Sequence, residues 1–167
     1  MLPSDHFVRM YNELFKMLAD KGQDNLEKYW LEISSLQDTL LGPYLKEKGF
    51  QGMYDYWDHI RLEENCEMDL LVTEEYFEFK MHVCPSLSKN LDNDAGLCMQ
   101  YCEHCAGWIN PVIRNAGFFP VYDMISPTEP RCHFRAYKEG DKDKAISFAE
   151  KAAYLWDPYN DLGLKQF

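Results

Sequence analysis

The sequence lacks any long hydrophobic run. It has no stretch of about 18 apolar residues, the length that a membrane-spanning helix needs. Its first twenty residues, MLPSDHFVRMYNELFKMLAD, carry charges throughout and contain neither a hydrophobic signal core nor a small-residue cleavage site. We therefore expect no membrane span and no secretion signal, and we predict a cytoplasmic protein.

Basic residues are also scarce. The chain has 17 Lys and Arg against 28 Asp and Glu, which gives a formal net charge of −11. Binding to nucleic acid phosphates requires a basic face, and binding to an anionic membrane surface requires one too. We therefore expect neither nucleic acid nor a membrane as partner, which leaves a small-molecule substrate as the predicted partner. The sequence does not indicate an oligomeric state.

Internal repeats and low-complexity segments are absent, and we predict a single domain over residues 1–167. With 46% hydrophobic and 15% aromatic residues, the chain can fill a full-sized core. Residues 1–63 show apolar side chains at helical spacing and form the predicted helical part. One helix is expected to end at Gly22, and a second is expected to stop at Gly42-Pro43.

From Cys66 the apolar pattern changes to a period of two, which is typical of strands. Residues 66–155 therefore form the predicted α+β part, with a polar loop at 86–96. Helices are expected at 97–109, at 111–116 and after Asp141, and strands at 68–72, 77–83, 118–125 and 132–137. The predicted fold class is α+β, with an antiparallel sheet of about four strands packed against the helical N-terminal half and a Cys-bearing helix.

The chain has only six cysteines, yet three of them lie in the stretch CMQYCEHC, residues 98–105. In a reducing compartment, thiols, metal ligands or redox groups are more usual than a disulfide framework, although the even count permits bridges. On one helix Cys98, Cys102 and Cys105 would share a face. The rise of about 10.5 Å over seven residues would still prevent Cys98 and Cys105 from binding the same zinc ion.

A mononuclear metal site would therefore use Cys102 and Cys105, which form a C-x-x-C pair. Cys84 and Cys132, each beside a predicted strand end, would complete the set, and His104 or His133 could substitute. Zinc is the first choice of metal, and iron or an iron-sulfur cluster is the second. No second C-x-x-C strengthens this interpretation, and free cysteine often only packs in a core, so simple packing remains an alternative.

The cysteine pattern resembles that of the L-2-amino-thiazoline-4-carboxylic acid hydrolase-like family. The matching features are a strand ending in Cys84-Pro85, a cysteine at position 102, and a strand that opens with Cys132-His133-Phe134. The resemblance covers roughly residues 77–137 and implies hydrolytic opening of a cyclic amidine. It assigns Cys84, Cys102 and Cys132 to the cysteine positions of the family. Cys105 stands where the family often has an acidic residue, which weakens the case for the same hydrolysis and favours a metal.

Two functions follow from these patterns. In the first, the protein is a hydrolase-like enzyme that cleaves a C–N or C–S bond. Either a thiolate attacks the substrate directly, or a thiolate-bound metal activates the water that does so. Its catalytic residues would be Cys102, Cys84 and His104, and its substrate would contact Trp108, Phe118 and Phe79. In the second, the domain is non-catalytic and binds a metal or a small molecule around a structural thiolate site.

Overall fold

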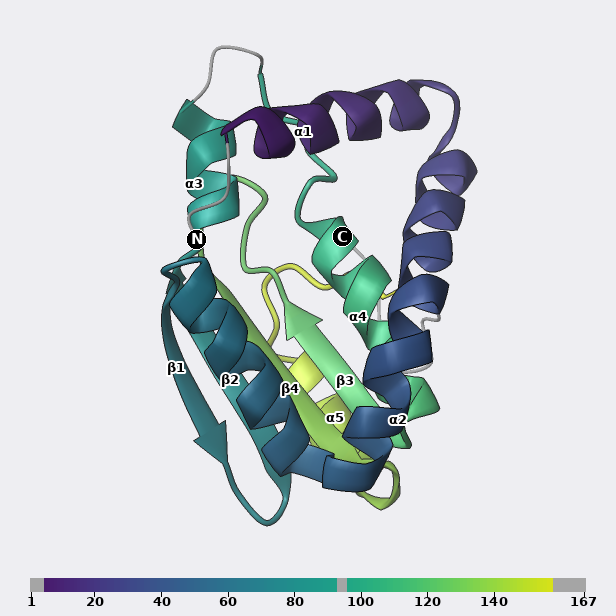
Figure 1. Ribbon diagram of the computed structural model, residues 1–167, viewed down its shortest axis with the longest axis vertical. Helices are drawn as coiled ribbons and strands as arrows, with labels where there is room; N and C mark the ends of the chain where they lie inside the picture. Colours follow the sequence, from purple (N-terminus) through teal and green to yellow (C-terminus); the bar gives the residue numbers. More distant parts are fainter. Residues whose placement is uncertain (1–4, 93–95, 158–167) are drawn as a thin grey trace.

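A computed structural model describes residues 5–92 and 96–157 of the chain (Figure 1). It has an α+β fold with one four-stranded antiparallel sheet in the order β1-β2-β4-β3, which confirms the predicted fold class. The elements are α1 (Asp5–Asp20), α2 (Gln23–Glu63), β1 (Glu67–Val72), β2 (Tyr76–Val83), α3 (Pro85–Asp92), α4 (Glu103–Asn115), β3 (Phe118–Asp123), β4 (Cys132–Lys138), the 3-10 helix η1 (Glu139–Asp141) and α5 (Lys142–Ala149).

The N-terminal half is helical, as predicted, but its second helix runs further than expected. We expected this helix to stop at Gly42-Pro43, whereas α2 continues through Pro43 and is interrupted only at Gly49, where φ is 61°. Leu41 and Leu45, on either side of the proline, are buried in the core. Their packing offsets the hydrogen bond that proline cannot donate. Glycine adopts a positive φ without strain, so the chain bends at Gly49 instead.

The predicted hairpin of β1 and β2 is confirmed, and β4 pairs with the other edge of β2. Phe77 and Phe79 of β2 and Phe134 of β4 point to one face of the sheet, where they are fully buried. The rings of Phe79 and Phe134 stack with centroids 5.0 Å apart, and Trp57 of α2 stacks on Phe134 at 5.4 Å. This aromatic layer joins the helical half to the sheet.

Helices cover the two faces of the sheet unequally. The kinked α2 and helix α4 lie over the aromatic face, which we call the inner face, while α5 packs behind β3 and β4 (Figure 1). A second, smaller apolar cluster forms beneath α5 around Val121 and Tyr137. No helix among residues 5–92 and 96–157 is both long and apolar enough to cross a bilayer.

The Cys-bearing helix starts later than predicted. We expected a helix over 97–109 that would place Cys98, Cys102 and Cys105 on one face, but α4 begins at Glu103 and runs through Pro111 to Asn115. The backbone N–H of Cys98 instead donates to Oδ1 of the buried Asn12 at 2.8 Å. That bond ties Cys98 to α1.

The segment at 86–96, predicted as a polar loop, was also assigned wrongly. Most of it belongs to α3, and its residues 93–95 lie outside the described part of the chain. The buried Leu87 and Asn90 give this short helix an inward face. Because Pro85 stands at its first position, where no N–H is needed, the helix can start directly after β2.

Candidate functional site

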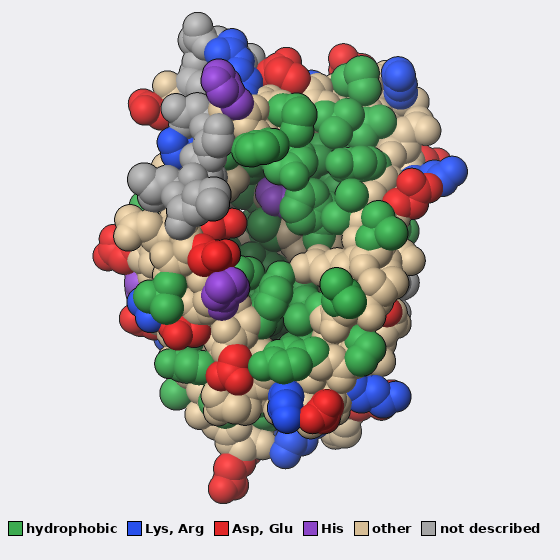
Figure 2. Space-filling model, viewed as in Figure 1, with side chains coloured by type: hydrophobic (Ala, Val, Ile, Leu, Met, Phe, Trp, Pro, Cys, Tyr) green, Lys and Arg blue, Asp and Glu red, His purple; other side chains and the backbone are tan. Residues whose placement is uncertain are grey.

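A cavity of about 570 Å³ opens between the inner face of the sheet and the helices. Hydrophobic side chains surround this hollow in the space-filling view (Figure 2). All six cysteines are free thiols, and five of them line the cavity: Cys66, Cys84, Cys102, Cys105 and Cys132. The structure therefore brings together the four cysteines that the sequence singled out and adds Cys66.

Local structure explains how four of these thiols reach the cavity. Cys132 opens β4 on the same side as Phe134, because alternate residues of a strand share a face. Cys84 follows the last residue of β2, where the chain turns into α3, and its N–H donates to the carbonyl of Pro130. Cys102 and Cys105 come from the turn that begins α4. Two strand ends and one helix start therefore meet at the cavity.

His104 lies in the cavity wall with both ring nitrogens engaged. Nδ1 contacts the backbone carbonyl of Tyr101, and Nε2 lies 3.5 Å from Sγ of Cys105. A carbonyl can only accept a hydrogen bond, so Nδ1 must carry the proton and Nε2 must be the acceptor. The Cys105 thiol is thus placed to donate to His104. The sequence paired His104 with Cys102 and Cys84, but the structure pairs it with its neighbour.

Burial keeps this pair neutral. It lowers the pKa of His104 to about 4 and raises the pKa of Cys105 to about 11, because the charged form of each group would lose its contact with water. A hydrogen bond from Tyr122 acts on Cys105 in the opposite sense but is outweighed. At neutral pH the pair is therefore a thiol and an imidazole, not a thiolate and an imidazolium.

The other cavity thiols are neutral for the same reason. Burial raises the pKa of both Cys84 and Cys66 to about 12, and it also raises the pKa of Cys102 and Cys132. The start of a helix usually lowers a thiol pKa, yet at Cys102 burial outweighs that effect. The cavity therefore presents neutral thiols, which behave as small apolar groups.

The four predicted metal ligands share the cavity without forming a metal site as they are placed. In the described part of the chain, no three Cys, His, Asp or Glu side chains are grouped closely enough to hold one ion. A tetrahedral zinc site needs four donors at bond lengths of about 2.0 to 2.3 Å from one point. Binding of zinc, iron or an iron-sulfur cluster by Cys84, Cys102, Cys105 and Cys132 stays a prediction and would require these side chains to move together.

Two of the three predicted substrate contacts line the cavity. Phe79 forms part of the wall on the sheet side, and Trp108 forms part of the wall on the side of α4. Phe118 is not among the lining residues; its ring packs against Phe50, with centroids 5.2 Å apart. It lies on the same face of β3 as Tyr122, which does line the cavity, but four residues away, or about 13 Å along the strand.

Several lining residues had no signal in the sequence. Tyr101 precedes α4 and donates to or accepts from Ser86 at 2.8 Å, while the hydroxyl of Tyr122 lies 3.7 Å from Sγ of Cys132. The inward alternation of β3 could have identified Tyr122. Nothing in the sequence distinguished Glu64, at the end of α2, from the many other acidic residues, because its role depends on where the helix ends.

Comparison with known proteins adds no relative. No family model matches the chain, and no curated protein and no solved structure was found to be similar to it. The likeness to the L-2-amino-thiazoline-4-carboxylic acid hydrolase-like family therefore remains a prediction based on the cysteine pattern.

Proposed function

We propose that the protein binds a small, mainly apolar organic molecule in the thiol-lined cavity. The observation that carries this proposal is the cavity itself. Its volume of about 570 Å³ falls in the range of ligand pockets, roughly 300 to 1,000 Å³. Aromatic side chains and neutral thiols form most of its wall, so an apolar ligand would replace water there at little cost.

The wall combines a rigid side with an adaptable one. Phe79 belongs to the stacked aromatic layer of the sheet, and Trp108 is held edge-on to Tyr11 of α1, with centroids 5.8 Å apart. Met81 and Met124 also line the cavity, and flexible thioether side chains can adjust to a ligand. This combination supports binding of a ligand with a definite shape.

Narrowing the cavity provides the test of binding. Ile60 of α2 lines the cavity and is partly buried, so the substitution Ile60→Trp should fill part of it. We expect the affinity for the uncharged fluorescent probe N-phenyl-naphthylamine to fall about tenfold or more, since the tryptophan side chain would occupy space that the probe needs. The matched control is Leu62→Trp, at a position two residues further along α2 that is 64% exposed and outside the lining.

Two results would contradict the proposal. One is a wild-type protein that does not bind the probe. The other is an equal loss of affinity in Ile60→Trp and Leu62→Trp, which would place the probe outside the cavity. Circular dichroism and thermal unfolding of both variants establish that a loss of binding does not reflect a loss of folding.

A second candidate function is thiol-dependent hydrolysis, which the Cys105–His104 pair favours. The sulfur of Cys105 would attack an electrophilic amidine carbon, and the thiol proton would pass to Nε2 of His104, 3.5 Å away. The π electron pair of the C=N bond would move to the ring nitrogen, which takes up that proton to give a tetrahedral adduct. The second amidine nitrogen would then form a double bond to the carbon as the ring C–N bond breaks, and the proton that this nitrogen loses would pass to the departing nitrogen. Water would then displace the sulfur and regenerate the thiol. The neutral state of the pair means that proton transfer must accompany the attack.

Serine substitutions separate this hydrolysis from binding alone. We expect Cys105→Ser to abolish ring opening of L-2-amino-thiazoline-4-carboxylate while leaving affinity for the uncharged probe unchanged. Cys102→Ser tests the thiol that the sequence favoured, and Cys98→Ser is the control, because Cys98 is buried outside the cavity lining. Full turnover by Cys105→Ser, or no turnover by the wild type, would contradict the hydrolase function.

Metal binding has its own test. The prediction of a thiolate-bound zinc or iron is checked by elemental analysis and absorption spectroscopy of anaerobically purified protein. If the predicted ligand set is correct, metal should bind the wild type in a one-to-one ratio and should be lost in Cys132→Ser. It should be kept in Cys98→Ser, whose thiol is not one of the predicted ligands.

A further inference from the structure

The charged residues of the cavity are unevenly distributed. Among the described residues that line it, Arg131 is the only Lys or Arg, whereas two carboxylates, Glu63 and Glu64, lie at its edge. The guanidinium of Arg131 is already engaged, since its Nε and Nη2 atoms contact Glu129 at 2.8 and 2.6 Å. His104 is engaged as well, because its Nδ1 contacts the carbonyl of Tyr101 and its Nε2 lies 3.5 Å from Sγ of Cys105.

Among the described residues that line the cavity, an anionic ligand would therefore find no basic side chain other than Arg131, which already contacts Glu129. Burying a carboxylate without a hydrogen-bonded cation costs several kcal/mol. The carboxylates of Glu63 and Glu64 add to that cost, because they belong to the lining and would repel a second negative charge. The cavity is thus electrostatically negative as well as apolar.

The same wall is well suited to a positive charge. Eight aromatic rings line it, from Phe7, Tyr11, Tyr56, Trp57, Phe79, Tyr101, Trp108 and Tyr122. The face of an aromatic ring attracts a cation, most strongly when water is excluded, and cages of such rings are used to hold alkylammonium groups. Aromatic rings and a nearby carboxylate therefore act in the same direction.

We infer that the molecule bound in this cavity is a lipophilic organic cation, with its apolar body against the thiols and aromatic rings and its positive charge toward Glu64. This inference rests on the proposed binding function and gives its ligand class. It also separates the cavity from the carboxylate-bearing amidine that the family resemblance implies, because that substrate carries the charge that the cavity disfavours.

Three probes that share a phenylalkyl body and differ in the charge of the head group test the inference. Phenylbutyl-trimethylammonium, phenylbutanol and phenylbutanoate are compared for their ability to displace N-phenyl-naphthylamine at low salt. We expect the cation to compete about tenfold more tightly than the alcohol, and the carboxylate about tenfold less tightly. High salt should reduce the difference between the cation and the alcohol.

A matched pair of variants locates the effect. Glu64→Gln should lower the preference for the cation over the alcohol about threefold, since it removes one partly exposed charge and keeps the side-chain shape. Glu47→Gln changes the net charge of the protein by the same amount at an exposed position outside the lining, so it should leave the preference unchanged.

The outcomes distinguish this inference from the function on which it rests. If the probe binds but the carboxylate competes as well as the alcohol, or the cation no better, the ligand class is wrong while the binding function stands. If Glu47→Gln alters the preference as much as Glu64→Gln does, the effect comes from overall charge and the inference fails. If the uncharged probe does not bind at all, the binding function and this inference fail together.

Discussion

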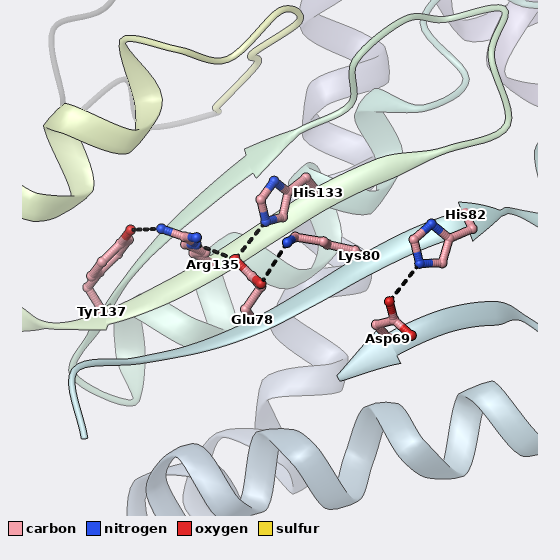
Figure 3. A network of polar contacts seen from close by, with 7 residues as sticks. All are labelled: Asp69, Glu78, Lys80, His82, His133, Arg135 and Tyr137. Carbon is pink, nitrogen blue, oxygen red and sulfur yellow. Dashed lines mark hydrogen bonds and ion pairs between the residues drawn. The ribbon is translucent and has the colours of Figure 1, made fainter. Parts of the chain in front are cut away.

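The two faces of the sheet differ in the charge of the polar groups that are buried on them. On the inner face, beneath α2 and α4, the groups at the cavity are neutral thiols and a neutral histidine. On the outer face, the same strands carry a charged network centred on Glu78 of β2 (Figure 3). The two sets are separated only by the alternation of the strands, because Phe77 and Phe79 point inward while Glu78 points outward.

The outer network is fully paired. The carboxylate of Glu78, only 5% exposed, contacts Nε2 of His133 at 2.8 Å and Nζ of Lys80 at 3.4 Å, and it accepts a hydrogen bond from Arg135. The guanidinium of Arg135 lies 4.4 Å from the ring centre of Phe148. Burial opposes ionisation of Glu78, but the hydrogen bonds from His133 and Arg135 outweigh it and lower its pKa.

The difference shows that burial alone does not decide whether a group is charged. Glu78 and His104 are about equally inaccessible, yet Glu78 keeps its charge because Arg135, Lys80 and His133 contact its carboxylate, whereas the ring nitrogens of His104 contact a carbonyl and a thiol. The inner face thus remains a suitable wall for an apolar ligand, while the outer face stabilises the contact between β2, β4 and α5.

The largest expected effect comes from removing the centre of the outer network. Glu78→Ala leaves the guanidinium of Arg135 partly buried without its carboxylate partner, and we expect a loss of about 3 to 5 kcal/mol in the free energy of unfolding. Lys80→Ala removes a half-exposed member of the same network and should cost under about 1 kcal/mol. Urea denaturation measures both. Equal costs would contradict the central role of Glu78.

The next effect concerns the pH dependence of stability, which His104 on the inner face should influence. Unfolded His104 takes up a proton near its ordinary pKa of 6.5, whereas in the fold its pKa is about 4. As pH falls from about 6.5 to 4, protonation therefore favours unfolding, and we expect a loss of up to about 3 kcal/mol in the free energy of unfolding. His104→Phe should lack this part of the loss. Parallel stability curves for the two proteins over this range would show that His104 is not buried as described.

The smallest of the three effects is in thiol reactivity. Because burial raises the pKa of Cys105 to about 11, little thiolate exists at neutral pH, although a more basic thiolate is also more nucleophilic. We expect alkylation by iodoacetamide to be about 30-fold slower than at an exposed cysteine introduced by Ser35→Cys on α2. Peptide mass spectrometry measures both rates in one protein. Similar rates would mean that the cavity thiols are ionised or exposed.

Much of the fold could be predicted from local patterns. The apolar period of two over 77–83 predicts which residues of β2 face inward, and Phe77 and Phe79 are indeed buried there. The convergence of Cys84, Cys102, Cys105 and Cys132 was also anticipated, since strand ends and a helix start often meet at one edge of a sheet. Helix limits were less predictable, because the burial of Leu41 and Leu45 carries α2 past Pro43.

The sequence by itself determined the α+β class, the strand faces and four of the five cysteines that line the cavity, because these depend on the spacing of residues along the chain. Only the tertiary structure decided that Cys98 is held by Asn12, that His104 faces Cys105, and that Glu63 and Glu64 lie at the cavity. It also decided that α4 packs so closely on α2 that a Cβ at Gly107 would lie 2.9 Å from Trp30. These features depend on distances between segments far apart in the chain, which no local pattern encodes.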